Sequence, residues 1–355
     1  MTALAKGRGR IIALFIQLNT IGAAIATAKP ETWKDKSAAD SLVIYILSGG
    51  SLTDVVPLLK SDAIVESERS LARGALAYAT NHEADAIALL GKADLSALDA
   101  RLAGQVAFAH SVLETKRDPR AATELLDWSR LLAPGGLVEE AALRREITLL
   151  AEAKDVRRVA MLTRQYSTRF AASLYAADFF RELAGAIARL GLADDPANYQ
   201  LLANAAAVLP PDARQDFLLT LAKSAVIYAR FDAAAGAATE ALRGARADTP
   251  EAARARLYLA VSQIFSDRYD AATADLQNLP ASKLDRTDAN LLAAARRVAA
   301  ELRIAPDAAA VDTQEPSPGD GDKNNADGPA LTIKRAEEAL KRTSALALMH
   351  QGGAP

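Results

Sequence analysis

Cysteine is absent from this chain of 355 residues. Its absence excludes disulfides, thiolate metal sites and cysteine nucleophiles, and it is compatible with an oxidising compartment without requiring one. Aromatic residues are also scarce, at 5% of the chain. Valine, isoleucine and threonine are too thinly scattered to build a large β-sheet. Alanine, leucine, arginine and glutamate dominate instead, which is typical of an all-helical protein.

Neither sign of charge is in large excess, because 42 lysines and arginines stand against 44 aspartates and glutamates, for a formal net charge of −2. No strong field therefore recruits nucleic acid or an anionic membrane. Long apolar runs are lacking as well. The longest covers residues 11–26 and is shorter than the roughly 20 residues that span a bilayer.

The first 28 residues have the layout of a secretory signal peptide. Lys6, Arg8 and Arg10 precede the apolar run, and residues 26–28 (Ala-Thr-Ala) fit a small-x-small cleavage pattern. Cleavage there would deliver the mature chain to the periplasm of a bacterium, or to the outside. Retention of the segment as an uncleaved anchor is the alternative interpretation.

Two stretches, residues 223–242 and 257–276, share one pattern: an apolar helix, then Arg-aromatic-Asp-Ala-Ala, then an alanine-rich helix. The motif begins at Arg230 and Arg268, 38 positions apart, within the period range of helical-repeat arrays. We expect the aromatic residue to fill the wedge where two antiparallel helices cross, and Asp232 and Asp270 to cap the second helix. One such hairpin cannot bury its apolar faces alone, so hairpins must stack.

Similar helical pairs are predicted along the rest of residues 29–304, with Asp, Pro or Gly at the breaks. The predicted fold class is therefore all-α: a tetratricopeptide-like α-solenoid of stacked helical hairpins, whose Trp and Gly consensus positions are mostly missing. The run at residues 42–47 admits either a strand or a helix. We favour a helix with Ser37 as its N-cap and Gly49 as its stop, because no second strand is available to pair with it.

The composition changes at residue 305. Residues 305–329 are rich in Asp, Pro, Gly, Ser and Asn, which predicts a disordered acidic linker. Residues 330–355 form a tail with an amphipathic helical pattern over 331–350. That helix is either marginal when free, or it docks on a partner or back on the solenoid.

Patterns that carry chemistry are not found. His82, His110 and His350 are far apart and none has metal-ligand spacing. No glycine-rich phosphate loop or nucleophile elbow is present. The carboxylate pairs at residues 139–140 and 194–195 stand at helix starts, where the helix macrodipole favours them. The sequence therefore predicts a protein that is not an enzyme and has no cofactor and no metal.

Basic residues are densest in the helical pair over residues 138–170. The favoured interpretation is a solvated face with ion pairs inside the helices. The alternative is an arginine-rich face that binds a partner. The candidate partner-binding residues of that face are Arg144, Arg145, Arg157, Arg158 and Arg164.

Four blocks, residues 68–78, 131–146, 190–199 and 209–217, resemble the MotC family of bacterial motility proteins. The resemblance covers roughly residues 51–302 and leaves the tail unmatched. It implies a non-enzymatic periplasmic protein that flagellar rotation requires, and that acts with MotB, the stator subunit that grips peptidoglycan. It brings no site residues with it.

Three functions follow as hypotheses. The first is a solenoid that binds and supports the periplasmic domain of MotB. The second is a generic periplasmic tetratricopeptide-type adaptor in cell-envelope assembly. The third, an enzyme such as a helical lytic transglycosylase, is disfavoured because no glutamate stands out as a catalytic acid.

Overall fold

The computed structural model describes residues 16–309. Most of the predicted linker, the tail and His350 lie outside these residues, as does the first part of the predicted signal peptide. Every regular element between residues 16 and 309 is helical, so the all-α class is confirmed. The chain divides into two compact units, Met1–Ala177 and Asp178–Pro355.

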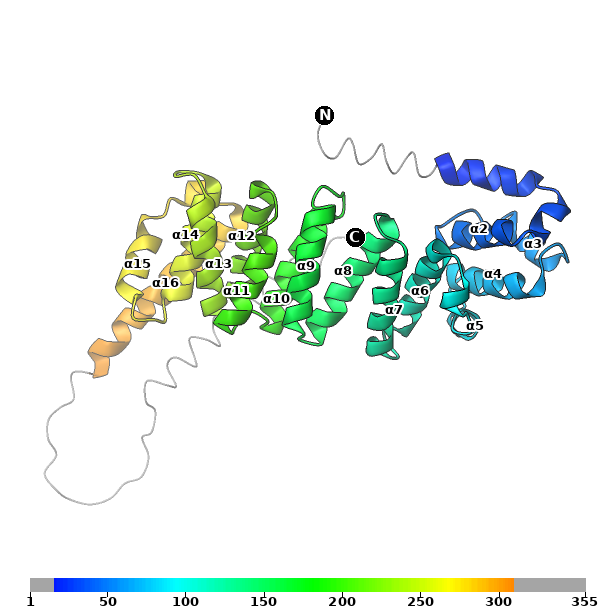
Figure 1. Ribbon diagram of the computed structural model, residues 1–355. Helices are drawn as coiled ribbons and strands as arrows, with labels where there is room; N and C mark the ends of the chain where they lie inside the picture. Colours follow the sequence, from blue (N-terminus) through cyan, green and yellow to red (C-terminus); the bar gives the residue numbers. More distant parts are fainter. Residues whose placement is uncertain (1–15, 310–355) are drawn as a thin grey trace, which may run out of the picture. The chain divides into compact units, whose positions relative to one another are not determined.

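The first unit is a series of helical hairpins (Figure 1). Helices α4 and α5, α6 and α7, and α8 and α9 pack as successive antiparallel pairs, and α2 packs on α4 and α6. Its elements are a helix over residues 16–27, η1 (Pro30–Lys34), α2 (Lys36–Leu47), α3 (Val55–Lys60), α4 (Glu66–Ala79), α5 (Glu83–Leu90), η2 (Leu95–Ala97), α6 (Ala100–Glu114), α7 (Pro119–Leu132), α8 (Leu137–Glu152) and α9 (Val156–Phe170).

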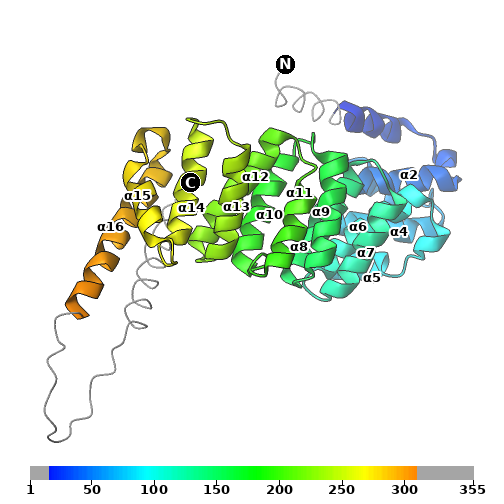
Figure 2. The same cartoon turned by 60° about the vertical axis from the view of Figure 1, so that its left-hand side comes forward.

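The second unit repeats the arrangement. Figure 2 shows α12, α13 and α14 side by side, and α14 packs in turn on α15 and α16. The two predicted repeats are thus the hairpins α12–α13 and α14–α15. The elements are α10 (Ala176–Leu190), α11 (Pro196–Ala206), α12 (Pro211–Ile227), α13 (Phe231–Gly244), α14 (Pro250–Gln263), α15 (Tyr269–Asn278), η3 (Ala281–Lys283) and α16 (Arg286–Ala309). Helix α16 runs to Ala309, into the segment predicted as a linker.

Alanine makes the close packing of these hairpins feasible. The buried face of α13 consists entirely of alanine. Gly236 of the same helix lies under the ring of Tyr199, and a Cβ at that position would be 2.9 Å from the Tyr199 Cζ atom. Small residues therefore set the distance between α13 and its neighbours, and the burial of many methyl groups replaces that of a few large side chains.

The run at residues 42–47 is helical, as favoured, but its N-cap is not Ser37. The Asp35 carboxylate accepts a hydrogen bond from the Ala38 amide, so α2 begins at Lys36 and Ser37 lies inside its first turn. Gly49 adopts a left-handed φ of 84° just past the helix, which confirms the predicted stop.

The helix over residues 16–27 lies beside α2 (Figure 1). Leu18 and Ile25 pack against the apolar cluster that α2 helps to form. A Cβ at Gly22 would lie 2.6 Å from the Tyr45 hydroxyl oxygen, so the glycine permits this close approach. Among the helices of residues 16–309, none combines the length and the apolar character needed to cross a membrane.

The expected role of the repeat aspartates was wrong. Helix α13 begins at Phe231 and α15 at Tyr269, so Asp232 and Asp270 lie within the first turn and cap nothing. The N-cap positions are occupied by the arginines, without a side-chain cap. The carboxylates instead sit where the macrodipole favours negative charge.

The repeat aromatics link one hairpin to the next. The Phe231 ring lies 5.5 Å from that of Phe265, in the turn after α14, the first helix of the next hairpin. Tyr269 donates a hydrogen bond to the carbonyl oxygen of Ala299 in α16. Phe231 therefore contacts the following hairpin and Tyr269 the following helix, while each stands at the turn of its own hairpin, which couples neighbouring elements of the stack.

Candidate functional site

Helix α8 carries carboxylates on its buried face. Along α8, the residues Glu139, Leu143, Glu146 and Leu150 follow one another at intervals of four, three and four positions, so they lie on one face of the helix. All four are buried. Glu140 is buried as well. The sequence interpretation placed residues 139–140 at a helix start for electrostatic reasons only and missed their burial. For Glu139, the burial could have been inferred from the helical spacing that places it on the same face as Leu143 and Leu150.

Glu146 sits at the centre of an ion network between α7, α8 and α9. It accepts hydrogen bonds from Arg130 Nε at 3.0 Å and from Arg158 Nη2 at 2.8 Å. Arg158 also reaches Asp127 at 2.7 Å, and Asp127 pairs with Arg130. Burial, and then the Asp127 carboxylate, raise the pKa of Glu146 to about 7, against the lowering effect of the two arginines. The network joins two neighbouring hairpins.

The other two buried carboxylates of α8 are also satisfied. Glu139 accepts from Arg169 Nη2 at 2.9 Å and from Gln165 Nε2 at 3.2 Å. Glu140 accepts from the Tyr166 hydroxyl at 2.9 Å. Burial, followed by the contact with Glu140, raises the pKa of that phenol. These ion pairs run between helices and end on buried carboxylates, whereas the favoured sequence interpretation expected a solvated face with ion pairs inside the helices.

The five candidate arginines do not form one cluster. Arg158 belongs to the Glu146 network, and the Arg144 guanidinium stacks over the Tyr175 ring, 4.7 Å from its centroid. Arg145 is half-buried, and its charge lowers the pKa of the Tyr78 phenol, against the larger effect of burial.

Arg157 and Arg164 are exposed and lie on one face of α9, two turns apart. In residues 16–309 they make no ion pair. Met161, between them on the same face, is 55% exposed. This face thus presents two unpaired cations with an apolar side chain between them.

Exposed apolar side chains accompany these cations on the neighbouring helix. On α7, Trp128 is 54% exposed and Leu131 is 64% exposed. The bond between Asp127 and Arg158 ties α7 to α9. We define the α7–α9 surface as five exposed side chains: Trp128, Leu131, Arg157, Met161 and Arg164. Exposed tryptophan and arginine are the residue types that most often dominate the energy of protein interfaces.

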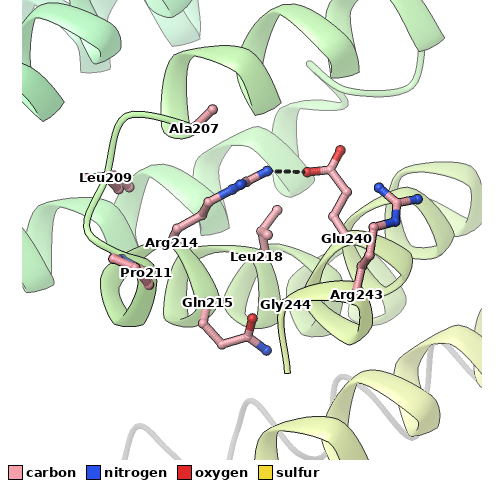
Figure 3. Close-up of a pocket in the computed structure, with 9 residues that line it drawn as sticks. All are labelled: Ala207, Leu209, Pro211, Arg214, Gln215, Leu218, Glu240, Arg243 and Gly244. Atoms are coloured by element: carbon pink, nitrogen blue, oxygen red, sulfur yellow. Dashed lines mark hydrogen bonds and ion pairs between the residues drawn. The ribbon is translucent and has the colours of Figure 1, made fainter. Parts of the chain in front are cut away.

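The second unit contains a cavity of about 340 Å³ between α12, α13 and the turn that precedes α12 (Figure 3). Arg214 of α12 points across it and bonds Glu240 of α13 at 3.1 Å. Gln215 donates to the carbonyl oxygen of Ala241 at 3.0 Å. The cavity has an apolar wall of Ala207, Leu209, Pro211 and Leu218 and a polar wall of Arg214, Gln215, Glu240 and Arg243.

A second buried carboxylate network lies in the same unit. Asp288 of α16 is fully buried and pairs with Lys223 of α12 at 2.9 Å and Arg254 of α14 at 3.2 Å. It also accepts a hydrogen bond from the Tyr258 hydroxyl at 2.8 Å. These contacts connect the hairpins α12–α13 and α14–α15 with helix α16, which is a structural role.

The histidines within the described part of the chain lie apart from each other. His82 precedes α5 and its Nδ1 lies 2.8 Å from the Thr80 hydroxyl. His110 lies in α6, where burial lowers the pKa of its imidazole. No group of three or more histidines and carboxylates among residues 16–309 is arranged to hold a metal ion.

The family described as "Chemotaxis protein MotC" matches residues 13–352. The chain belongs to the MotC family. A curated chemotaxis protein MotC from Rhizobium meliloti (strain 1021) is 27% identical over 307 residues, which cover 85% of this chain and 69% of that protein.

The family match is longer than the sequence blocks suggested. It begins inside the predicted signal peptide and continues through the tail, which the block resemblance left unmatched. The matched range therefore includes the segments predicted as linker and tail. No solved structure matches the chain. The family assignment makes this a motility- and chemotaxis-associated protein.

Proposed function

We propose that this MotC-family protein acts in the periplasm without catalysis, binding the periplasmic part of the stator subunit MotB and supporting it during flagellar rotation. The family match over residues 13–352 carries the proposal. The N-terminal layout of a secretory signal supports the compartment. A stack of helical hairpins suits the role, because it offers an extended surface and needs no cofactor.

The α7–α9 surface is the part of the first unit that fits a protein partner best. Trp128 and Leu131 leave apolar area in water, which an isolated fold does not require. Arg157 and Arg164 add positive charge that no carboxylate among the described residues neutralises. A partner segment that carries apolar side chains flanked by carboxylates would complement both features.

Co-purification tests the proposal. The chain from residue 29 onward is mixed with the MotB periplasmic domain, and retention on an affinity resin and the dissociation constant are measured. We expect the wild-type chain to form a complex with the MotB periplasmic domain. The double substitution Trp128→Ala and Arg157→Ala should weaken it by about 2–4 kcal/mol, roughly 30-fold or more. The matched control is Tyr228→Ala, since Tyr228 is also an exposed aromatic but lies in the second unit.

Two outcomes would contradict the proposal. One is the absence of any complex between the chain and MotB, together with normal swimming of a strain that lacks the gene. The other is a complex with other envelope proteins in place of MotB, which would favour the generic adaptor. If the chain binds MotB and the double substitution leaves that binding intact, MotB is a partner but the α7–α9 surface is not the binding site.

A further inference from the structure

The cavity of the second unit has the properties of a binding site. It is a concave space of about 340 Å³, across which Arg214 of α12 reaches Glu240 of α13 (Figure 3). Arg214 and Arg243 enter from α12 and α13, and the apolar lining comes from the turn after α11 and from α12, where Leu218 lies one turn after Arg214. Concave sites with an apolar lining and a few convergent polar groups are the usual form of ligand sites.

The charge of the lining favours one negative charge in the ligand. The two arginines bring two positive charges, and Glu240 brings one negative charge. Glu240 is bonded to Arg214, so Arg243 is the cation that remains. Arg243 is exposed and has no ion pair within residues 16–309. The lining therefore has one uncompensated positive charge, which a single carboxylate would balance and a doubly charged phosphate would exceed beside Glu240.

The Arg214 guanidinium has hydrogen-bond donors that its contact with Glu240 does not use. The Nε of Arg214 is buried and has no hydrogen-bond partner among the described residues. The side chain of Arg214 as a whole is 41% exposed, so its terminal nitrogens, and not the covered Nε, are the donors open to a ligand in the cavity. Gln215 already donates to the Ala241 carbonyl, which fixes the wall on that side.

Apolar groups line part of the cavity and continue next to it. Val208 stands in the chain between the lining residues Ala207 and Leu209 and is 41% exposed. A free small anion would make no use of these apolar groups. A peptide whose acidic residue enters the cavity would place its neighbouring apolar residues against them.

We propose that the cavity between α12 and α13 is a second binding site, which takes an aspartate or glutamate side chain of an acidic, partly apolar peptide segment from a protein partner. Arg243 and Arg214 hold the carboxylate, and Val208 and the apolar lining contact the apolar neighbours. The site lies in the second unit and does not depend on MotB being the partner.

Fluorescence anisotropy with defined peptides tests the site. The probe is a fluorescein-labelled peptide in which Leu-Asp pairs alternate with single Ala residues. The matched probe carries Asn in place of each Asp. We expect the full chain to bind the acidic peptide at least about tenfold more tightly than the amide peptide, since hydrogen bonds to charged groups are the stronger class. The substitution Arg243→Ala should weaken binding of the acidic peptide by about tenfold or more.

The controls separate the cavity from general charge effects. Arg246→Ala removes an exposed arginine that follows α13 but does not line the cavity, and it should leave binding unchanged. Arg243→Lys should restore part of the affinity. Circular dichroism of each variant confirms that the helices are intact, which is expected because Arg243 is exposed.

Three results would overturn the proposal. They are equal binding of the acidic and amide peptides, an equal loss in the Arg243→Ala and Arg246→Ala variants, and displacement of the peptide by acetate at the concentration of the peptide itself. The last result would identify a small-anion site. Failure of MotB to bind the chain would leave these measurements unaffected, so the two proposals are tested separately.

Discussion

We expect the ion network around Glu146 to lose stability as the pH rises. A carboxylate paired with arginines usually has the opposite effect. Glu146 is fully buried, and Arg130 and Arg158 contact it at 3.0 and 2.8 Å. An exposed ion pair of this kind would hold the carboxylate ionised. Here burial and the Asp127 carboxylate outweigh the two arginines and raise the pKa of Glu146 from its ordinary 4.5 to about 7.

The pKa difference determines how stability changes with pH. The folded chain binds the Glu146 proton more tightly than the unfolded chain, so between pH 4.5 and about 7 the folded state holds more protons. Stability from this group is therefore complete below pH 4.5 and is lost as the pH rises to about 7. Each pKa unit corresponds to about 1.4 kcal/mol, so the loss amounts to about 3 kcal/mol.

The substitution Glu146→Gln isolates this effect, because glutamine is neutral at every pH. We expect the free energy of unfolding of the wild type, relative to the variant, to fall by about 3 kcal/mol between pH 4.5 and pH 8. Urea denaturation followed by circular dichroism at several pH values measures it. Glu124→Gln, at an exposed carboxylate of α7, is the control and should show little change.

A wild type that gains stability over Glu146→Gln as the pH rises would refute the reasoning. It would mean that the two guanidinium contacts outweigh burial and that Glu146 is ionised throughout. A flat difference over the whole range would mean that water reaches the network and screens it.

Three further substitutions test packing and charge burial, each by chemical denaturation. Gly236→Ala places a Cβ 2.9 Å from the Tyr199 Cζ atom and should destabilise the chain by about 1–3 kcal/mol. Gly185→Ala, in α10 with no atom within 4 Å of the added Cβ, should instead be neutral or stabilising by up to about 1 kcal/mol. Asp288→Asn removes the charge that Arg254 faces at 3.2 Å in the interior, and should cost about 3–5 kcal/mol. A cost below about 1 kcal/mol would show that this pair contributes no more than a surface ion pair.

The helical architecture followed from the sequence by itself. Scarce β-branched residues, abundant alanine and a motif repeated at Arg230 and Arg268 indicated stacked hairpins, and glycines such as Gly49 marked where helices end. These features are local, since propensity, period and turn chemistry act within a few residues. The family could also be recognised from the sequence, because long matching blocks do not depend on knowing the fold.

Tertiary structure alone decided what each charged residue does. In the sequence Arg157 and Arg158 look alike, yet one is exposed and the other is bound by Asp127 and Glu146. Their difference depends on which side of α9 faces α7, and on carboxylates that are distant in the chain. The cavity beside Arg243 has the same origin, because its walls come from helices whose relative placement depends on how closely alanine and glycine let them approach.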